Sequence, residues 1–94
     1  MEMAMVRECE VGDCSYNWEH RCHAFAITIG DDVHPMCDTF CRSSGKGGTS
    51  EAIAGVGACK VSGCSHNNHL ECECSEISVG YRGEEIDCMN FESR

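Results

Sequence analysis

The stretch CSYNWEHRC, residues 14–22, recurs fifty residues later as CSHNNHLEC, residues 64–72, with both cysteines, the serine and one asparagine in place. When the chain is compared with itself at this offset, residues 9–30 pair with residues 59–80, and eight of the 22 positions are identical. The chain is therefore a tandem duplication. In the first copy the identical positions are Cys9, Val11, Cys14, Ser15, Asn17, Cys22, Ile27 and Gly30.

After a one-residue insertion in the second copy, Cys37 pairs with Cys88, so each copy holds four repeated cysteines within about 30 residues. A closed structural zinc site takes four tetrahedral thiolate or imidazole ligands, with two to four residues between the members of a local pair. C-x4-C lies at the wide end of that range. The sequence predicts two zinc ions, held by Cys9, Cys14, Cys22 and Cys37 and by Cys59, Cys64, Cys72 and Cys88.

The composition offers little apolar material for a core. Ten of the 94 residues are cysteine, whereas the aromatic residues are three Phe, one Trp and two Tyr. Units below about 40 residues rarely fold on apolar burial alone. If the chain forms two half-length units, each of them needs a crosslink or a metal ion.

The charge argues against several classes of partner. Sixteen acidic residues against seven basic ones give a net charge of -9, and the basic residues are scattered along the chain. Nucleic-acid binding requires clustered Lys and Arg, so we expect no nucleic-acid partner. No segment is long and apolar enough to span a bilayer, and the N-terminus lacks the apolar run of a secretory signal. We expect a cytoplasmic monomer without a membrane partner.

Zinc competes with other uses of the same cysteines. Thiols in a reducing cytoplasm stay free or bind metal, whereas outside the cell the same pattern would form disulfides. A single iron in four thiolates would have the same geometry. A metallothionein-like metal buffer and a thiol redox sensor are the alternative functions. The apolar residues between the cysteines favour structural sites over a buffer.

The expected fold class is a small, β-rich, metal-stabilised protein with little helix, made of two tandem zinc-binding modules of four cysteines each. Alternation at residues 25–29, repeated at 77–79, predicts a half-buried strand. Glycine-containing turns are expected at residues 30–32 and 80–83, so that a short hairpin returns the fourth cysteine in each module. The expected domains are residues 1–41 and 59–94. Residues 42–58, rich in Gly, Ser and Ala, should form a flexible linker that lets the modules move with partial independence, with a candidate helical turn at 50–54.

Other candidate residues break the repeat. Cys41 and Cys74 have no counterparts, and each is close in sequence to a predicted ligand, so both are candidates for ligand competition or redox exchange. The five histidines do not recur at equivalent sites, and we expect surface or turn positions for them. Ser15 and Asn17 suit turns in which their side chains bond nearby backbone. No catalytic or cofactor-binding residues are predicted, because four thiolates leave zinc no open position.

The sequence resembles a bacterial family of short proteins described as a domain of unknown function, DUF1540. The matching text is CEVGDCSYNWEHRCHAFAITI with MCDTF in the first copy, and CKVSGCSHNNHLECECSEISV with CMNF in the second. The resemblance implies a small cysteine-rich metal-binding domain in a bacterial cytoplasm, with no activity to carry over. Cys74 stands where the first copy has Ala24.

We expect the biological role to reside in the exposed surface of a non-enzymatic protein-interaction module. Tyr16, Trp18 and Phe25 give the first copy more aromatic area than the second, so a protein partner is expected there.

Overall fold

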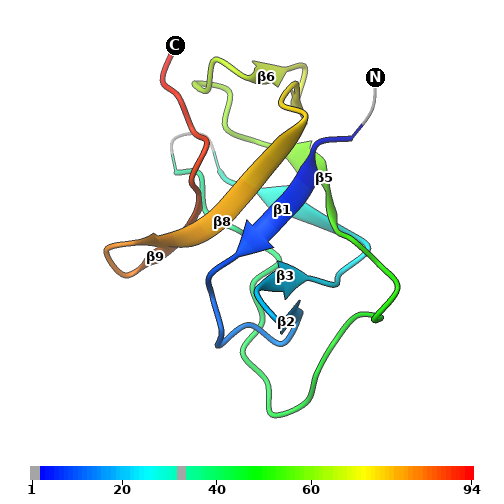
Figure 1. Ribbon diagram of the computed structural model, residues 1–94. Helices are drawn as coiled ribbons and strands as arrows, with labels where there is room; N and C mark the ends of the chain where they lie inside the picture. Colours follow the sequence, from blue (N-terminus) through cyan, green and yellow to red (C-terminus); the bar gives the residue numbers. More distant parts are fainter. Residues whose placement is uncertain (1–2, 32–33) are drawn as a thin grey trace.

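The computed structural model describes residues 3–31 and 34–94, and its strands form one central sheet with a small two-stranded ribbon at either end (Figure 1). Within these residues there is no helix, as the expected β-rich class requires. The strands are β1 (Met5–Cys9), β2 (Asn17–Trp18), β3 (Arg21–Cys22), β4 (Ala26–Ile29), β5 (Gly55–Cys59), β6 (Asn67–Asn68), β7 (Glu71–Cys72), β8 (Glu76–Arg82) and β9 (Glu85–Cys88).

The central sheet exchanges strands between the two copies. Its order is β4-β5-β1-β8-β9. β1 of the first copy runs parallel to β8 of the second, and β5 of the second copy runs parallel to β4 of the first. The two halves meet at the centre, where β1 and β5 are antiparallel and Met5 is opposite Gly55. Each copy therefore completes the sheet of the other.

This topology corrects the expectation that the modules move with partial independence. Residues 55–58 of the predicted linker belong to β5, and the Gly47 and Thr49 amides donate hydrogen bonds to Ser15 O and His23 O at 2.9 and 3.1 Å. The radius of gyration is 12.2 Å, close to the roughly 12 Å expected for one compact domain of this length. In place of the predicted helical turn, residues 50–51 form an ordinary turn.

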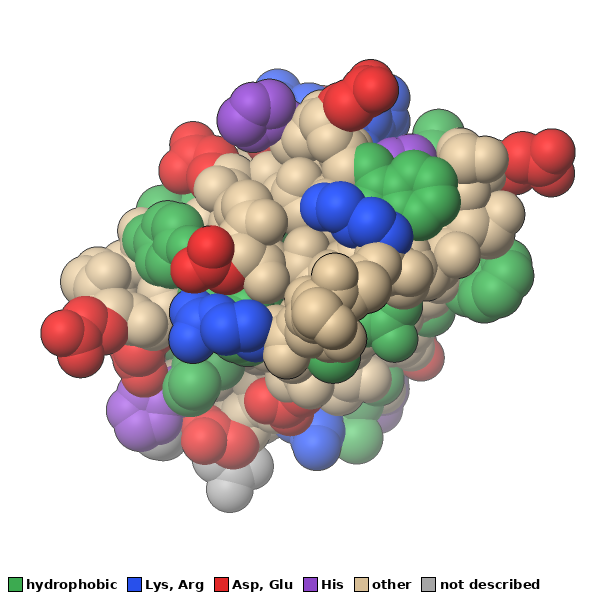
Figure 2. Space-filling view, turned by 90° about the horizontal axis from the view of Figure 1, so that it is seen from below, with side chains coloured by type: hydrophobic (Ala, Val, Ile, Leu, Met, Phe, Trp, Pro, Cys, Tyr) green, Lys and Arg blue, Asp and Glu red, His purple; other side chains and the backbone are tan. Residues whose placement is uncertain are grey.

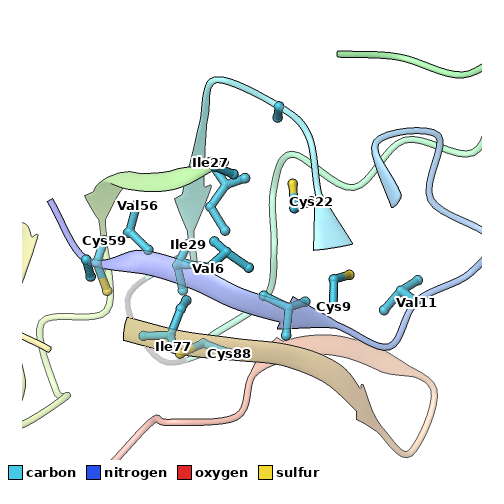
Figure 3. Close-up of a cluster of buried hydrophobic side chains, with 14 of the residues drawn as sticks. Val6, Cys9, Val11, Cys22, Ile27, Ile29, Val56, Cys59, Ile77 and Cys88 are labelled. Carbon is cyan, nitrogen blue, oxygen red and sulfur yellow. The ribbon is translucent and has the colours of Figure 1, made fainter. Parts of the chain in front are cut away.

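The core is built from β-branched side chains that alternate along the exchanged strands. Ile27 and Ile29 of β4 are 2% exposed each, and the intervening Thr28 is half-buried. Val6 of β1 and Ile77 of β8 are buried between the two ends of the sheet. Figure 3 shows these apolar side chains between labelled cysteines of the first copy on one side and of the second copy on the other. One shared core thus separates the two groups of cysteines.

The predicted hairpins are confirmed in the second copy, with a shift in the turn. β8 and β9 pair antiparallel with Val79 opposite Cys88, so the hairpin returns the fourth cysteine as expected. However, β8 continues through residues 80–82, and the turn lies at residues 83–84, where Gly83 has a φ of 65°. In the first copy a single bridge joins Ile29 to Cys37. The predicted turn at residues 30–32 extends outside the described residues.

Candidate metal centres

The first quartet comes from four separate pieces of local structure. Cys9 ends β1, Cys14 lies in the following turn, Cys22 lies in β3, and Cys37 forms the bridge to Ile29 of β4. All four line one cavity of about 10 Å³, which is roughly the volume that holds one water-sized particle. Tyr16 and Phe40 also line this cavity. The structure therefore brings the four predicted ligands of the first copy to a common place.

The second quartet repeats this construction. Cys59 ends β5, Cys64 lies in the turn, Cys72 lies in β7 and Cys88 ends β9. The four cysteines line a cavity of about 20 Å³. Each quartet has one half-buried member, Cys37 in the first copy and Cys72 in the second, and its other three cysteines are buried.

The repeated asparagine fixes the backbone of the first cysteine of each quartet. Asn17 is 6% exposed; its Nδ2 donates to Cys9 O at 2.7 Å, and its Oδ1 accepts from the His20 amide at 3.2 Å. The Cys9 amide donates to His20 O at 2.8 Å. Glu19 and His20 both have positive φ, 56° and 67°, which makes a tight turn between β2 and β3. The asparagine thus joins the end of β1 to the turn that precedes Cys22.

The second copy has the same clamp with nearly the same distances. Asn67 Nδ2 donates to Cys59 O at 2.8 Å, and the Leu70 amide donates to Asn67 Oδ1 at 3.1 Å. The predicted role of the asparagine in turn chemistry is confirmed. Its reach across eight residues to the backbone of a cysteine was not predicted, although the equal spacing of Cys9 to Asn17 and Cys59 to Asn67 is the signal that could have indicated it.

Each cavity has a wall supplied by the other copy. Val79 and Ile86 of the second copy line the first cavity, and Ile29 and Pro35 of the first copy line the second. The fourth cysteines are also joined across the copies by the backbone. The Cys37 amide donates to Ile86 O, and the Cys88 amide donates to Pro35 O, both at 2.8 Å. The two quartets therefore share backbone and side-chain supports.

The cysteine sulfurs surround each cavity without closing on one point. Within residues 3–31 and 34–94, no group of three or more His, Cys, Asp or Glu side chains has the arrangement of a formed metal site. All ten cysteines are free thiols. Burial raises the pKa of the Cys37 and Cys88 thiols to about 11, so both are protonated at neutral pH. A metal ion would have to displace these protons, as it does in known thiolate sites.

The donor set nevertheless suits zinc. Four thiols border the first cavity and five border the second, where Cys74 adds to the quartet. Each space admits one small particle, and the remaining lining is mostly apolar. Because zinc held by four thiolates has Zn–S distances of about 2.3 Å, the thiols of each quartet would have to close around the ion. The first quartet would hold one ion and the second quartet another.

Cys41 and Cys74, the two cysteines without a counterpart in the other copy, differ in their position relative to the cavities. Cys41 is exposed and does not line the first cavity, although its carbonyl accepts a hydrogen bond from the Ser15 amide. Cys74 lines the second cavity, where desolvation and the neighbouring Cys72 raise its pKa to about 12. Only Cys74 is therefore placed to compete with the predicted ligands.

The histidines mostly follow the expectation of surface or turn positions. His20, His34 and His69 are exposed. His23 stacks on Trp18 with ring centroids 4.9 Å apart. His66 differs, because it is half-buried and lines the second cavity, with Nε2 3.7 Å from Glu92 Oε2.

Comparison with known families agrees with the duplicated architecture. The sequence model of a family described as Domain of Unknown Function (DUF1540) matches residues 8–45 and again residues 58–91. The chain belongs to the DUF1540 family. The two matched segments confirm the two tandem copies, and each contains one complete quartet. Neither a curated protein nor a solved structure matches the chain. Among the described residues, no helix is long and apolar enough to cross a membrane.

Proposed function

We propose that this DUF1540 protein binds two zinc ions, one in each cysteine quartet, and that both ions are structural. The observation that carries the proposal is that the eight duplicated cysteines border two small cavities, four cysteines to a cavity. In a closed site with four thiolates the ion has no open coordination position, so it stabilises the fold without catalysing a reaction. Structural zinc supplies about 10–16 kcal/mol of apparent binding free energy in small domains at neutral pH.

The location of the cavities supports a structural role for the ions. Each ion would join an end of the central sheet to the adjoining two-stranded ribbon and to the return segment that carries the fourth cysteine. The shared core between the centres also distinguishes this chain from a metal buffer, which needs thiolates but no packed interior. We retain the labile buffer and the thiol redox sensor as the competing functions.

The test is native mass spectrometry of the protein purified without chelator, combined with circular dichroism before and after addition of a chelator. We expect two zinc ions, a protein mass that shows no loss of hydrogen to disulfides, and unfolding when the metal is removed. Reductant alone should leave the fold intact. Visible absorbance would identify iron instead, and three or more readily exchanged ions would favour the buffer.

Matched variants can assign the ligands. Cys14→Ser removes a predicted ligand of the first quartet, whereas Cys41→Ser removes an exposed cysteine outside the cavity. Loss of zinc from the first variant and two retained ions in the second would support the assignment. An ordered, metal-free and oxidised protein would overturn the proposal and the cytoplasmic location proposed with it.

The proposed biological role is that of a protein-interaction module, and the exposed surface suggests where a partner binds. Phe25 is 78% exposed and lines a shallow concavity with Ile53, which is 49% exposed. Tyr16 and Trp18, by contrast, are half-buried. Of the three aromatic residues expected at a partner surface, Phe25 therefore supports that role best, because a contact through it would bury a large apolar side chain that is now in solvent.

The charge of the surface supports the choice of a protein partner over nucleic acid. Acidic side chains are spread around the face shown in Figure 2, and Lys and Arg side chains stand singly among them. Crosslinking of the Phe25→Ser variant to its partners in cells tests the surface. Leu70→Ser is the control, because Leu70 is another exposed apolar side chain, with an exposure of 52% against 78% for Phe25. A crosslink lost in the first variant alone would support it; crosslinks unchanged in both would contradict it.

A further inference from the structure

Three sulfur-bearing side chains meet at the surface near the start of the central sheet. Met3, Met5 and Cys74 line one open concavity of about 360 Å³, and Ser75 is the only other residue of its lining within the described chain. Met3 and Met5 are 47% and 36% exposed. The concavity lies outside the cysteine quartets, and no predicted ligand borders it.

The strand geometry explains why the two methionines face the same way. Ala4 and Val6 point into the core, with exposures of 1% and 0%. Because side chains alternate along an extended chain, Met3 and Met5 project from the opposite face. Two thioethers are thus presented side by side, while the intervening residue anchors the backbone.

Neighbouring strands position the two methionines, and both border the same concavity as Cys74. The Met5 amide donates to Ser75 O at 3.0 Å, which places Met5 beside the segment that leads into β8. Met3 lies across Gly55 of β5, where an added Cβ would stand 2.8 Å from Met3 Sδ. Glycine at that position therefore leaves room for the methionine side chain. The cluster is formed by the strand exchange, because its members come from opposite ends of the sequence.

Cys74 is an addition peculiar to the second copy. The equivalent residue of the first copy, Ala24, is 4% exposed and carries no donor atom. Cys74 lines the outer concavity and also the cavity of the second quartet. Its thiol is therefore reachable from solvent on one side and is next to the thiol of Cys72 on the other.

We propose that Met3, Met5 and Cys74 form a binding site for one soft monovalent metal ion of the copper(I) class. Thiolate and thioether ligands select such ions, whereas carboxylates and water suit harder ones. The cation would bind the two neutral thioethers and the Cys74 thiolate, and the Cys74 proton would leave to solvent. The net charge of -9 favours accumulation of cations near the protein. None of the eight cysteines predicted to hold zinc belongs to this site.

The experiment uses protein labelled with ¹³C at the methionine ε-methyl groups and silver(I) as the redox-inert probe. Zinc content is measured by native mass spectrometry on the same sample before silver is added. During the titration the Met3 and Met5 methyl signals should shift in one saturable step. Met36 and Met89, which are 37% and 41% exposed, are internal controls of similar exposure and should not shift in that step.

The matched variant is Cys74→Ala, which gives the second copy the residue that the first copy already has. We expect it to weaken silver binding by at least the roughly 10–100-fold that loss of a merely supporting residue causes in metal sites. The double variant Met3→Leu and Met5→Leu should weaken binding while leaving the Cys74 thiol in place. If Cys74→Ala fails to fold, the double variant alone decides the question.

The proposal is wrong if silver leaves the Met3 and Met5 signals unmoved, shifts the Met36 and Met89 signals together with them, or binds both variants as tightly as the unchanged protein. The zinc count is recorded first, so the two proposals are tested separately. A protein without zinc would contradict the function proposed for the quartets, whereas the methionine signals alone test the site at Met3, Met5 and Cys74.

Discussion

Replacement of Asn17 by alanine should destabilise the folded protein by about 2–4 kcal/mol. The substitution removes two hydrogen bonds of a side chain that is 6% exposed, one to Cys9 O at 2.7 Å and one from the His20 amide at 3.2 Å. A buried polar group left without a partner costs about 1–3 kcal/mol. Most of this loss of stability should come from the unpartnered Cys9 carbonyl, because the His20 amide lies near the surface and can bond to water.

The assay is urea unfolding of the protein as purified, followed by circular dichroism, with Asn67→Ala as the equivalent variant of the second copy. Asn68→Ala is the matched control, since its side chain makes an exposed bond to Glu73 Oε2; it should change stability by less than about 0.5 kcal/mol. Equal effects of Asn17→Ala and Asn68→Ala would refute the reasoning that the buried asparagine holds the first ligand in position.

Three further outcomes follow from the shared architecture. Gly30→Ala should lower the free energy of unfolding in urea by about 2–4 kcal/mol, because the residue has a φ of 84° and a Cβ there would stand 2.2 Å from Val61 Cγ2. Gly12→Ala is the control and should be tolerated, since the space around Gly12 is open. Equal losses of stability in the two variants would contradict this reasoning. Cys37→Ser should lower zinc retention at both centres in a chelator titration read by mass spectrometry. The reason is that Cys37 donates its amide to Ile86 O of the second copy and lines the same cavity as Ile86. Loss confined to one ion would contradict this coupling. Lys46→Ala removes a 2.9 Å hydrogen bond from Nζ to the Asn17 carbonyl and should speed hydrogen exchange in the first ribbon by a few-fold without altering the second, as amide-exchange NMR can check.

The local parts of this fold could be predicted from sequence because they depend on short-range chemistry. Alternating β-branched residues indicated the strand that became β4, and the cysteine spacing indicated which residues would gather. The turn after β8 was placed too early, because Gly80 resembles a turn residue. In the structure, Gly80 is opposite Asp87 in the hairpin, and a Cβ there would lie 3.0 Å from Glu10 Oε2. Glycine serves close packing at that position.

The strand exchange could not be predicted, because a duplicated sequence offers two equivalent partners for every strand. β1 could pair with the first copy's own β4 or with β8, and residues 26–29 and 76–79 have similar patterns. The small residues of the predicted linker were also misleading. Gly55 and Gly57 lie in β5. A Cβ at Gly55 would stand 2.7 Å from Met3 Cε, whereas a Cβ at Gly57 would make an ordinary contact with Ala26. The missing side chain at Gly55 leaves room for Met3, and both glycines belong to a strand and not to a flexible linker.

The exchange of strands also determines the order in which the molecule can be completed during translation. While the ribosome makes the first copy, β4 lacks its partner strand until β5 emerges, and the Cys37 amide lacks its acceptor until Ile86 does. The first quartet therefore cannot take up its final surroundings until nearly the whole chain has been synthesised. If the proposed zinc ions bind, the first centre would be completed late in translation, together with the second.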